Sequence, residues 1–362
     1  MRPALIAGAR PNFVKVAPLL RALESNGADR AFLVHTGQHY DDEMSASFFR
    51  DLDIRSPDTN LSVGSGSHAR QTAAVMSAFD GWLDEHPEVD MVVVFGDVNS
   101  TVACTLVAAK RGIPVAHVEA GLRSLDRSMP EEVNRLSVDV LARWLLTPSA
   151  DASANLIAEG AHPSRVQMVG NIMVDSLFYA RDRRPSDTTA DHLGLRGQPF
   201  ALVTLHRPAF VDDPSKLRAA IAAFNDFSET IPLIFPAHPR TASMLRQLDV
   251  VVSPNLHLCG PLTYLDFVAC QTDSSIVITD SGGVQEETTC LGVPCITMRD
   301  NTERPITVEQ GTNEVVGTNP NVAVRRALQR LSEPTLVRRP PLWDGCTAGR
   351  IVTALQSQPV FN

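Results

Sequence analysis

The chain has 362 residues, of which 44% are hydrophobic and 20% are charged, and this composition is typical of a globular protein large enough for two domains. A formal net charge of -9 without a long Lys/Arg run excludes a broad nucleic-acid-binding surface, although it is compatible with local basic sites for phosphate groups. The apolar N-terminal run stops at Arg10 and Pro11, too early for a membrane span, and no two cysteines form a C-x-x-C pair. We therefore expect a cytoplasmic protein with neither disulfides nor a metal site.

Short β-branched runs alternate with helical patterns along the chain, which predicts an α/β fold of parallel strands joined by crossover helices. In the first half the predicted strands are 4–7, 31–35, 91–95, 114–118, 144–147 and 166–169. A polar stretch at 181–198 is interpreted as a linker, and the later strands are 200–205, 232–235, 256–259, 275–279, 294–298 and 314–316.

This pattern predicts two Rossmann-like, doubly wound domains, at 1–170 and 171–345, with a C-terminal helix at about 346–362 that packs back on the first. Ligands of such sheets bind at the carboxyl ends of the strands. We therefore expect the two domains to face a central cleft that holds the ligand.

Two turns that follow predicted strands carry residues suited to phosphate groups. After the first strand, Gly8 permits a tight turn, and Arg10 and Lys15 lie on the next helix, where they either bind a diphosphate or are ordinary solvated cations. In the second half, Ser281, Gly282 and Gly283 precede a helix whose first amide groups can approach a phosphate closely. The chain has neither a G-x-G-x-x-G after a strand nor a P-loop motif, which argues against dehydrogenases and nucleotidases.

Acidic residues follow the same helix start and the middle strands of the first half. We expect Glu286 and Glu287 in the first helical turn, where they either stabilise the helix dipole or bind a ribose hydroxyl. Asp97 is either a helix cap or a site residue. Glu119 ends a buried strand, where an ionised side chain needs a partner, and Arg123 and Arg135 are near enough in sequence to supply one.

A histidine and a second acidic pair complete the candidates. Glu131 and Glu132 lie in the segment MPEEVNR. His206 closes the predicted strand at 200–205, where a lone histidine is often structural but here is predicted to face the carboxylates. From position alone, a structural ion-pair network and an acid/base site are comparable interpretations.

Eight segments of the chain together form a family signature: GARPNFVKVAPLL, HTGQHYD, VFGDVNST, HVEAGLRS, MPEEVNR, VTLHRP, DSGGVQEE and TERPITVEQGTN. With them the chain resembles the non-hydrolysing UDP-N-acetylglucosamine 2-epimerases from Gly8 to about Gly317. The resemblance implies a glycosyltransferase-B-like fold, a homodimer and a UDP-sugar substrate inverted at C2. It also implies a mechanism in which UDP is eliminated to a glycal and then added back. Because the sequence has neither a metal site nor a nicotinamide-binding motif, we expect no metal or nicotinamide cofactor.

The resemblance also implies roles for individual residues. Those expected to bind UDP are Arg10, Lys15, Ser281, Gly282, Gly283, Glu287 and Arg304, with Phe267 near the uracil and Arg135 counted among the substrate-binding residues. Those expected to surround the sugar as catalytic groups are Asp97, Glu119, Glu131 and His206.

The sequence departs from the commonest family pattern in the run after His206, which reads Arg-Pro-Ala-Phe, and at Ile306. The sugar substituents can therefore differ, so an epimerase of another UDP-2-acetamido sugar, including uronic acid derivatives, is one alternative. A hydrolysing epimerase, a retaining glycosyltransferase and a UDP-sugar-binding module without activity are the others.

Overall fold

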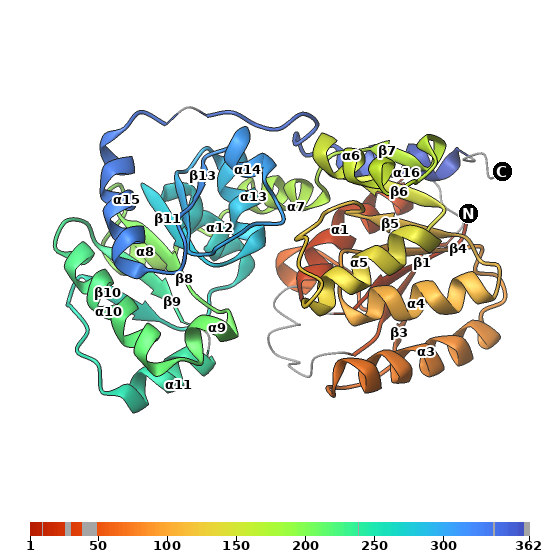
Figure 1. Cartoon of the computed structure of the whole chain (residues 1–362), viewed down its shortest axis with the longest axis horizontal. Helices are drawn as coiled ribbons and strands as arrows, with labels where there is room; N and C mark the ends of the chain where they lie inside the picture. The colour runs from red at the N-terminus through yellow and green to blue at the C-terminus, as the bar shows by residue number, and fades with distance from the viewer. Residues whose placement is uncertain (9, 26–29, 38–48, 238, 336, 358–362) are drawn as a thin grey trace. The chain divides into compact units, whose positions relative to one another are not determined.

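The computed structural model describes the chain except residues 9, 26–29, 38–48, 238, 336 and 358–362, and it also leaves the side chains of 10, 11, 208, 209, 239 and 240 undescribed. The chain forms two compact units (Figure 1): unit 1 comprises Met1–Tyr179 and Pro341–Asn362, and unit 2 comprises Ala180–Pro340. The first boundary lies beyond residue 170 because helix α7 (Ile172–Arg181) is bonded into unit 1. Ser176 of α7 donates a 2.6 Å hydrogen bond to the Val14 carbonyl, and Asp175 accepts the amides of Thr347 and Ala348.

Unit 1 is built on a seven-stranded parallel sheet with the strand order β3-β2-β1-β4-β5-β6-β7. Its strands are β1 (Pro3–Ala7), β2 (Phe32–His35), β3 (Thr59–Asn60), β4 (Met91–Phe95), β5 (Val115–Val118), β6 (Trp144–Thr147) and β7 (Val166–Met168). Its other helices are α1 (Arg10–Ser25), α3 (His68–Glu85), α4 (Asn99–Lys110), α5 (Pro130–Leu141), α6 (Ala150–Ala158), the 3₁₀ turn η1 (Pro163–Arg165) and α16 (Thr347–Gln356).

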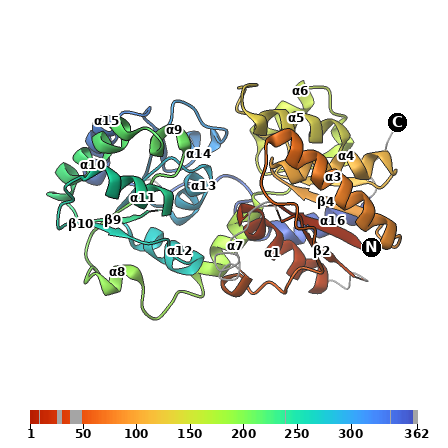
Figure 2. The same ribbon diagram turned by 90° about the horizontal axis from the view of Figure 1, so that it is seen from below.

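Helices cover both faces of this sheet, which is why its central strands are hydrophobic without interruption. Every residue of β4, Met-Val-Val-Val-Phe, is buried. Val92 and Val94 face the core beneath α3, α4 and α5, which lie in a row on one side. On the other side α1 packs against the C-terminal helix α16 (Figure 2).

Unit 2 repeats this arrangement with six parallel strands in the order β10-β9-β8-β11-β12-β13. The strands are β8 (Ala201–Thr204), β9 (Leu233–Pro236), β10 (Leu256–Cys259), β11 (Ile276–Thr279), β12 (Cys295–Thr297) and β13 (Asn313–Val315). The helices are α8 (Thr189–His192), α9 (Pro208–Val211), α10 (Pro214–Ser228), α11 (Pro239–Leu248), α12 (Tyr264–Asp273), α13 (Gly282–Leu291), α14 (Ile306–Glu309) and α15 (Pro320–Ser332).

The sheet of unit 2 separates two apolar cores. Val203 and Ile278 point into the core beneath α10 and α15, whereas Leu202 and Val277 point into a smaller core beneath α8, α12 and α13. Figure 2 shows α10 and α11 on one side of the sheet and α8 and α12 on the other. Alternate residues of one strand therefore supply both cores, as the pleat requires.

The prediction of a linker at 181–198 is wrong, because most of this polar stretch folds onto unit 2. Thr188 and Asp191 form a capping box at the start of α8, and Thr189 donates to Asp266 of α12 through its amide and hydroxyl groups. Ala190 and Leu195 are buried in the smaller core. The polarity of the stretch reflects helix capping rather than an unfolded connection.

Both sheets have the doubly wound strand order, which confirms the predicted α/β class with two Rossmann-like domains. In such sheets the chain adds strands first on one side of the starting strand and then on the other, and the place where this order reverses is the switch point. It lies between β1 and β4 in unit 1 and between β8 and β11 in unit 2. Within the described residues, no helix has the length and apolarity that crossing a bilayer requires.

Candidate active site

Asp97 lies directly after β4, at the switch point of unit 1. The residue that caps α4 is Val98, and its backbone is extended, so Asp97 does not have the capping role that its position allowed. Its carboxylate instead forms an ion pair with Arg135 of α5, and its carbonyl accepts a 2.8 Å hydrogen bond from the Asn134 side chain. Helix α5 therefore fixes the turn that carries this carboxylate.

Glu119 follows β5, is only 7% exposed, and forms an ion pair with Lys15 of α1. The sequence-based suggestion that Arg123 or Arg135 is its partner is wrong, because Arg123 pairs with Asp139 and Glu159 instead. The crossover topology brings α1 to the end of β5 although 104 residues separate the two partners.

The backbone around this pair has special conformations. Glu119 has φ of +74°, a region that a residue with a side chain seldom adopts and that costs about 1–3 kcal/mol. Gly96 has φ of +62°, and a Cβ atom there would lie 2.9 Å from the Lys15 Nζ atom. The positive φ favours glycine at this position, and the missing Cβ atom lets the Lys15 ammonium group lie against the turn before Asp97.

A buried network holds the two turns. His117 of β5 bonds through Nδ1 to Asp139 at 2.6 Å and through Nε2 to the Gly96 carbonyl at 2.8 Å. Asp139 also accepts the Gly121 amide and the Arg123 guanidinium. Burial opposes the ionisation of Asp139, but the charges of His117 and Arg123 outweigh it and lower its pKa.

The remaining predicted carboxylate of unit 1, Glu131, lies in the first turn of α5 and is half-buried. Its neighbour Glu132 is buried and accepts the amides of Ser124 and Leu125, so Glu132 stabilises a loop. Arg10 begins α1, but its side chain lies outside the described part of the structure.

In unit 2 the predicted phosphate-binding turn begins α13. Ser281 is the N-cap residue, yet its side chain makes no capping hydrogen bond, and Gly282 and Gly283 are half-buried. A Cβ atom on Gly282 would lie 2.7 Å from Arg304 Nη1, so this glycine lets the guanidinium lie against the start of the helix. Arg304 is in turn held by an ion pair with Glu286 at 2.9 Å.

Further arginines that the sequence analysis did not single out lie near Arg304. Arg299 binds both oxygens of Glu303, at 2.9 and 2.7 Å, and Arg207 approaches the same carboxylate at 3.8 Å. Burial disfavours ionised Glu303, but its bonds to Arg299 and the charge of Arg304 hold its pKa well below the usual range. Three arginines, Arg207, Arg299 and Arg304, thus lie with Glu286 and Glu303 near the start of α13, where guanidinium groups and helix amides can approach a phosphate.

Glu286 and Glu287 lie in the second turn of α13, not in the first as predicted, because the helix begins at Gly282. Glu287 is 5% exposed and accepts hydrogen bonds from Tyr264 at 3.2 Å and Gln271 at 2.8 Å. Burial among these neutral donors raises its pKa to about 7. Phe267 lies on α12, the helix that supplies both donors, and packs against the smaller core.

His206 follows β8 and pairs with a residue that the sequence analysis did not select. Its Nδ1 atom lies 2.8 Å from Asp280 Oδ1; the histidine side chain is 54% exposed and the aspartate is 1% exposed. Burial opposes the ionisation of Asp280, but hydrogen bonds from His206 and Arg207 lower its pKa. Asp280 could have been selected from the sequence, because it lies between a hydrophobic strand and the Ser-Gly-Gly turn.

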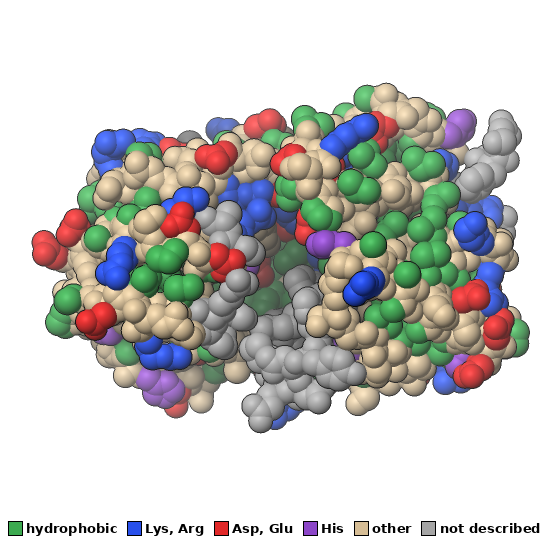
Figure 3. All heavy atoms as spheres, turned by 60° about the horizontal axis from the view of Figure 1, so that its bottom comes forward, with side chains coloured by type: hydrophobic (Ala, Val, Ile, Leu, Met, Phe, Trp, Pro, Cys, Tyr) green, Lys and Arg blue, Asp and Glu red, His purple; other side chains and the backbone are tan. Residues whose placement is uncertain are grey.

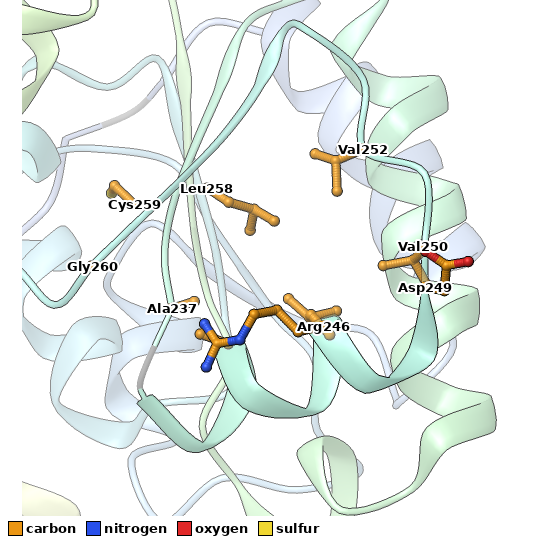
Figure 4. A pocket seen from close by; sticks show the side chains of 10 residues that line it. Ala237, Arg246, Asp249, Val250, Val252, Leu258, Cys259 and Gly260 are labelled. Carbon is orange, nitrogen blue, oxygen red and sulfur yellow. The ribbon is translucent and has the colours of Figure 1, made fainter.

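The described predicted residues are divided between the units: Lys15, Asp97, Glu119, Glu131 and Arg135 lie in unit 1, and His206, Phe267, Ser281, Gly282, Gly283, Glu287 and Arg304 lie in unit 2. A separate cavity of about 560 Å³ lies between α11 and the edge strand β10 (Figure 4). Leu245, Arg246 and Leu258 line it, and the described residues predicted for the site do not.

Three comparisons place the chain among known proteins. A family model described as UDP-N-acetylglucosamine 2-epimerase matches residues 21–356. A UDP-N-acetylglucosamine 2-epimerase of Methanocaldococcus jannaschii is 37% identical over 98% of this chain and 99% of its own length. A UDP-2,3-diacetamido-2,3-dideoxy-D-glucuronate 2-epimerase of Pseudomonas aeruginosa is 37% identical over 92% of this chain and 93% of its own.

Among solved structures, the Methanocaldococcus jannaschii UDP-GlcNAc 2-epimerase in complex with UDP-GlcNAc and UDP matches with a TM-score of 0.89. It is 36% identical, and the match covers 98% of this chain and 99% of that one. Sequence and fold therefore agree over nearly the whole length. The chain belongs to the UDP-N-acetylglucosamine 2-epimerase family.

Proposed function

We propose that this protein interconverts UDP-N-acetylglucosamine and UDP-N-acetylmannosamine by inverting C2 of the sugar. The observation that carries the proposal is the cluster at the end of β4 and β5, where Asp97 and Glu119 each face a cation. Family membership and the arginine-flanked start of α13 support a UDP-sugar as the substrate. The reaction needs a carboxylate that exchanges a proton and positive groups that stabilise a diphosphate. The cluster of Asp97 and Glu119 would supply the first, and Arg304 at the start of α13 would supply the second.

The chemistry explains why the diphosphate must leave. The C2 proton is not beside a carbonyl, so a carboxylate with an ordinary pKa of about 4 cannot remove it unaided. As the C1–oxygen bond stretches, positive charge grows on the ring and acidifies C2. Arg304, with the backbone amides of Gly282 and Gly283, would stabilise the departing diphosphate, and Arg10 would add a further charge.

The carboxylates would then exchange the proton on the two faces of the sugar. Asp97, Glu119 and Glu131 are the proposed acid/base groups, and His206 is proposed to contact the phosphate or the glycosidic oxygen. The ion pair with Lys15 of α1 fixes the position of the Glu119 carboxylate at the end of β5. Return of UDP to C1 after protonation on the opposite face completes the inversion.

Turnover in heavy water tests this mechanism. Epimerisation by elimination breaks the C2–hydrogen bond, so the product should carry deuterium at C2, as read by nuclear magnetic resonance. Product without solvent deuterium at C2 would exclude the elimination mechanism. Formation of free N-acetylmannosamine, or a requirement for an acceptor sugar, would instead favour a hydrolysing epimerase or a glycosyltransferase.

A second candidate substrate is a UDP-2,3-diacetamido uronic acid. This chain is 37% identical to the Pseudomonas aeruginosa enzyme and 37% identical to the Methanocaldococcus jannaschii enzyme. Sequence identity therefore supports the uronate as much as UDP-N-acetylglucosamine. Comparison of kcat/KM for the two UDP-sugars decides between them. A value at least about tenfold higher for the uronate, equivalent to 1.4 kcal/mol, would assign the enzyme to that substrate.

We also propose that the protein is a cytoplasmic homodimer that pairs through unit 1. Helix α5 exposes Val133 and Val140, at 50% and 74%, and a groove of about 520 Å³ lined by Met76, Pro130 and Val133 separates α5 from α3. Figure 3 shows hydrophobic side chains at the surface on this side of unit 1. A second copy would cover this apolar surface.

Light scattering after size exclusion tests the dimer. The double variant Val133→Glu/Val140→Glu should be monomeric, because it would bury charge in the contact. The control is Val251→Glu, since Val251 is 84% exposed in unit 2 and should tolerate the charge without dissociation. A monomeric wild-type protein would exclude the proposal.

A further inference from the structure

The switch point of unit 2 joins a histidine and an aspartate from adjacent strands. β8 ends at Thr204 and β11 at Thr279, and the two strands pair in register at these residues. The threonine hydroxyl groups lie 2.7 Å apart, which ties the strand ends together. His206 and Asp280 therefore leave the sheet side by side, at the position where doubly wound folds bind ligands.

Asp280 makes a full set of hydrogen bonds with the segment that carries His206. Its Oδ2 atom accepts the backbone amides of His206 at 3.0 Å and Arg207 at 2.9 Å. Its Oδ1 atom faces the His206 Nδ1 atom at 2.8 Å. The Arg207 side chain donates to the Asp280 carbonyl at 3.1 Å. Asp280 is therefore bonded to this segment through both its side chain and its backbone.

This geometry determines which nitrogen of His206 is available to a ligand. An ionised carboxylate only accepts hydrogen bonds, so the Nδ1 atom must carry a hydrogen. In the neutral ring the lone pair is then on Nε2, on a side chain that is 54% exposed while its partner is 1% exposed. The same carboxylate stabilises the ring when Nε2 gains a proton.

We propose that Asp280 is a positioning residue that holds His206 in the Nδ1–H tautomer and so presents Nε2 to the glycosidic oxygen of the substrate. The inference rests on the proposed function and extends it to a residue with no role in it so far. The donating form is the imidazolium, in which Nε2 has gained a proton and Asp280 stabilises the charge. As the C1–oxygen bond breaks, its electron pair passes to the diphosphate oxygen, and Nε2 donates this proton to that oxygen, which leaves the neutral Nδ1–H ring. On return of UDP the hydrogen goes back to Nε2, so protons balance over the cycle.

The variant Asp280→Asn separates tautomer control from folding. An amide oxygen at the Oδ2 position can keep both backbone hydrogen bonds, which leaves the amide NH₂ group facing Nδ1. This group donates rather than accepts, so it should reverse the tautomer and place the hydrogen on Nε2. In a serine protease triad, the equivalent aspartate-to-asparagine change leaves the geometry intact and lowers kcat about 10⁴-fold, because the histidine then adopts the wrong tautomer.

Nitrogen-15 spectra of protein labelled at histidine read the tautomer directly. In the wild type, neutral His206 should give a pyrrole-type signal for Nδ1 and a pyridine-type signal for Nε2, assigned by comparison with His206→Asn. Asp280→Asn should exchange the two types. A wild-type His206 with its hydrogen on Nε2 would overturn the proposal, and this measurement needs neither turnover nor a folded Asp280 variant.

Kinetics then test whether the tautomer matters. Asp280→Asn should lower kcat about 10²–10⁴-fold, with UDP affinity by calorimetry within about threefold of the wild type. His206→Asn should show a similar loss, and the double variant no further loss, because both changes remove one unit. Asp213→Asn is the matched control, since Asp213 also accepts two backbone amides in unit 2, at the start of α10.

Failure of the inference and failure of the proposed function give different results. If the wild type leaves C2 of UDP-sugars unchanged, the proposed function fails, while the nitrogen spectra still report whether Asp280 sets the tautomer. If the wild type is active and Asp280→Asn keeps its kcat while His206→Asn loses it, the function stands and the positioning role of Asp280 is excluded.

Discussion

Unit 1 and unit 2 have the same strand order, yet their switch points hold opposite chemistry. In unit 1 the acidic residues Asp97 and Glu119 pair with Arg135 of α5 and Lys15 of α1. In unit 2 the residues near the start of α13 include three arginines, Arg207, Arg299 and Arg304, which form ion pairs with Glu286 and Glu303. One doubly wound scaffold thus supplies carboxylates in the first half and positive charge in the second.

The two switch points also differ in how they keep a charged group near the protein interior. The Asp97 and Glu119 turns are held by side-chain networks from α5 and α1, and Glu119 has a strained backbone. The α13 turn relies on backbone amides and on a missing side chain at Gly282. A carboxylate that exchanges a proton needs a fixed direction, whereas a diphosphate can be held by several diffuse donors.

The largest expected effect tests the acid/base side of this comparison. Asp97→Asn keeps a hydrogen-bond acceptor for Arg135 but removes the negative charge, so turnover should fall about 10²–10⁴-fold while UDP affinity changes little. Steady-state kinetics and calorimetry measure the two quantities. Asp90→Asn is the control, because Asp90 is an exposed aspartate that binds only the chain's N-terminal segment among its described contacts. An active Asp97→Asn variant would leave unit 1 without its proposed role.

Much of the fold was accessible from the sequence because its signals are local. The strands at Met91–Phe95, Trp144–Thr147 and Leu256–Cys259 have the predicted bounds, since β-branched and apolar runs mark buried parallel strands. The two-residue strand β3 (Thr59–Asn60) was missed because it is polar and partly exposed. Candidates such as Asp97, Glu119 and His206 follow from a general rule, namely that polar groups at the carboxyl ends of strands gather at one edge of the sheet. Phe267 and Arg304 were named only through the family resemblance.

The pairing of those residues was not accessible, because crossover connections join segments that are distant in sequence. Nearness in the chain favoured Arg123 as a partner for Glu119, but the partner is Lys15. Asp280 and His206 meet only because β8 and β11 are neighbours in the sheet. Which carboxylate faces which cation is thus a property of topology rather than of local spacing.

A second prediction concerns Glu287, a buried carboxyl group of unit 2 whose described hydrogen bonds come from the neutral donors Tyr264 and Gln271. Burial raises the pKa of Glu287 from 4.5 to about 7, so the folded protein holds this proton more tightly than the unfolded chain. Its stabilising contribution is then fully present below pH 4.5 and is lost as the pH rises through about 7. The shift corresponds to roughly 3 kcal/mol at 1.36 kcal/mol per pKa unit.

Glu287→Gln should remove this pH dependence, because an amide can accept from Gln271 and donate to the Tyr264 hydroxyl without ionising. Denaturant unfolding of the ligand-free protein between pH 4.5 and pH 8 measures it, as the difference between wild type and variant. The variant should gain stability relative to the wild type as the pH rises. A constant difference across this range would mean that the pKa of Glu287 is not raised by its burial.

The smallest expected effect tests whether a missing side chain really shapes the phosphate site of unit 2. Gly282→Ala suits a helix start, but its Cβ would lie 2.7 Å from Arg304 Nη1 and should displace the guanidinium. Charge-assisted hydrogen bonds contribute about 1.5–3 kcal/mol, so Arg304→Ala should weaken UDP binding about tenfold or more, and Gly282→Ala somewhat less. The double variant should bind UDP no more weakly than Arg304→Ala alone, because the group that the methyl displaces is gone.

Gly81→Ala is the matched control, since a Cβ there meets nothing within 4 Å, and it should leave UDP affinity unchanged. If both Gly282→Ala and Arg304→Ala bind UDP as tightly as the wild type in calorimetry, positive charge in unit 2 does not serve the diphosphate, and the contrast between the two switch points loses its functional meaning.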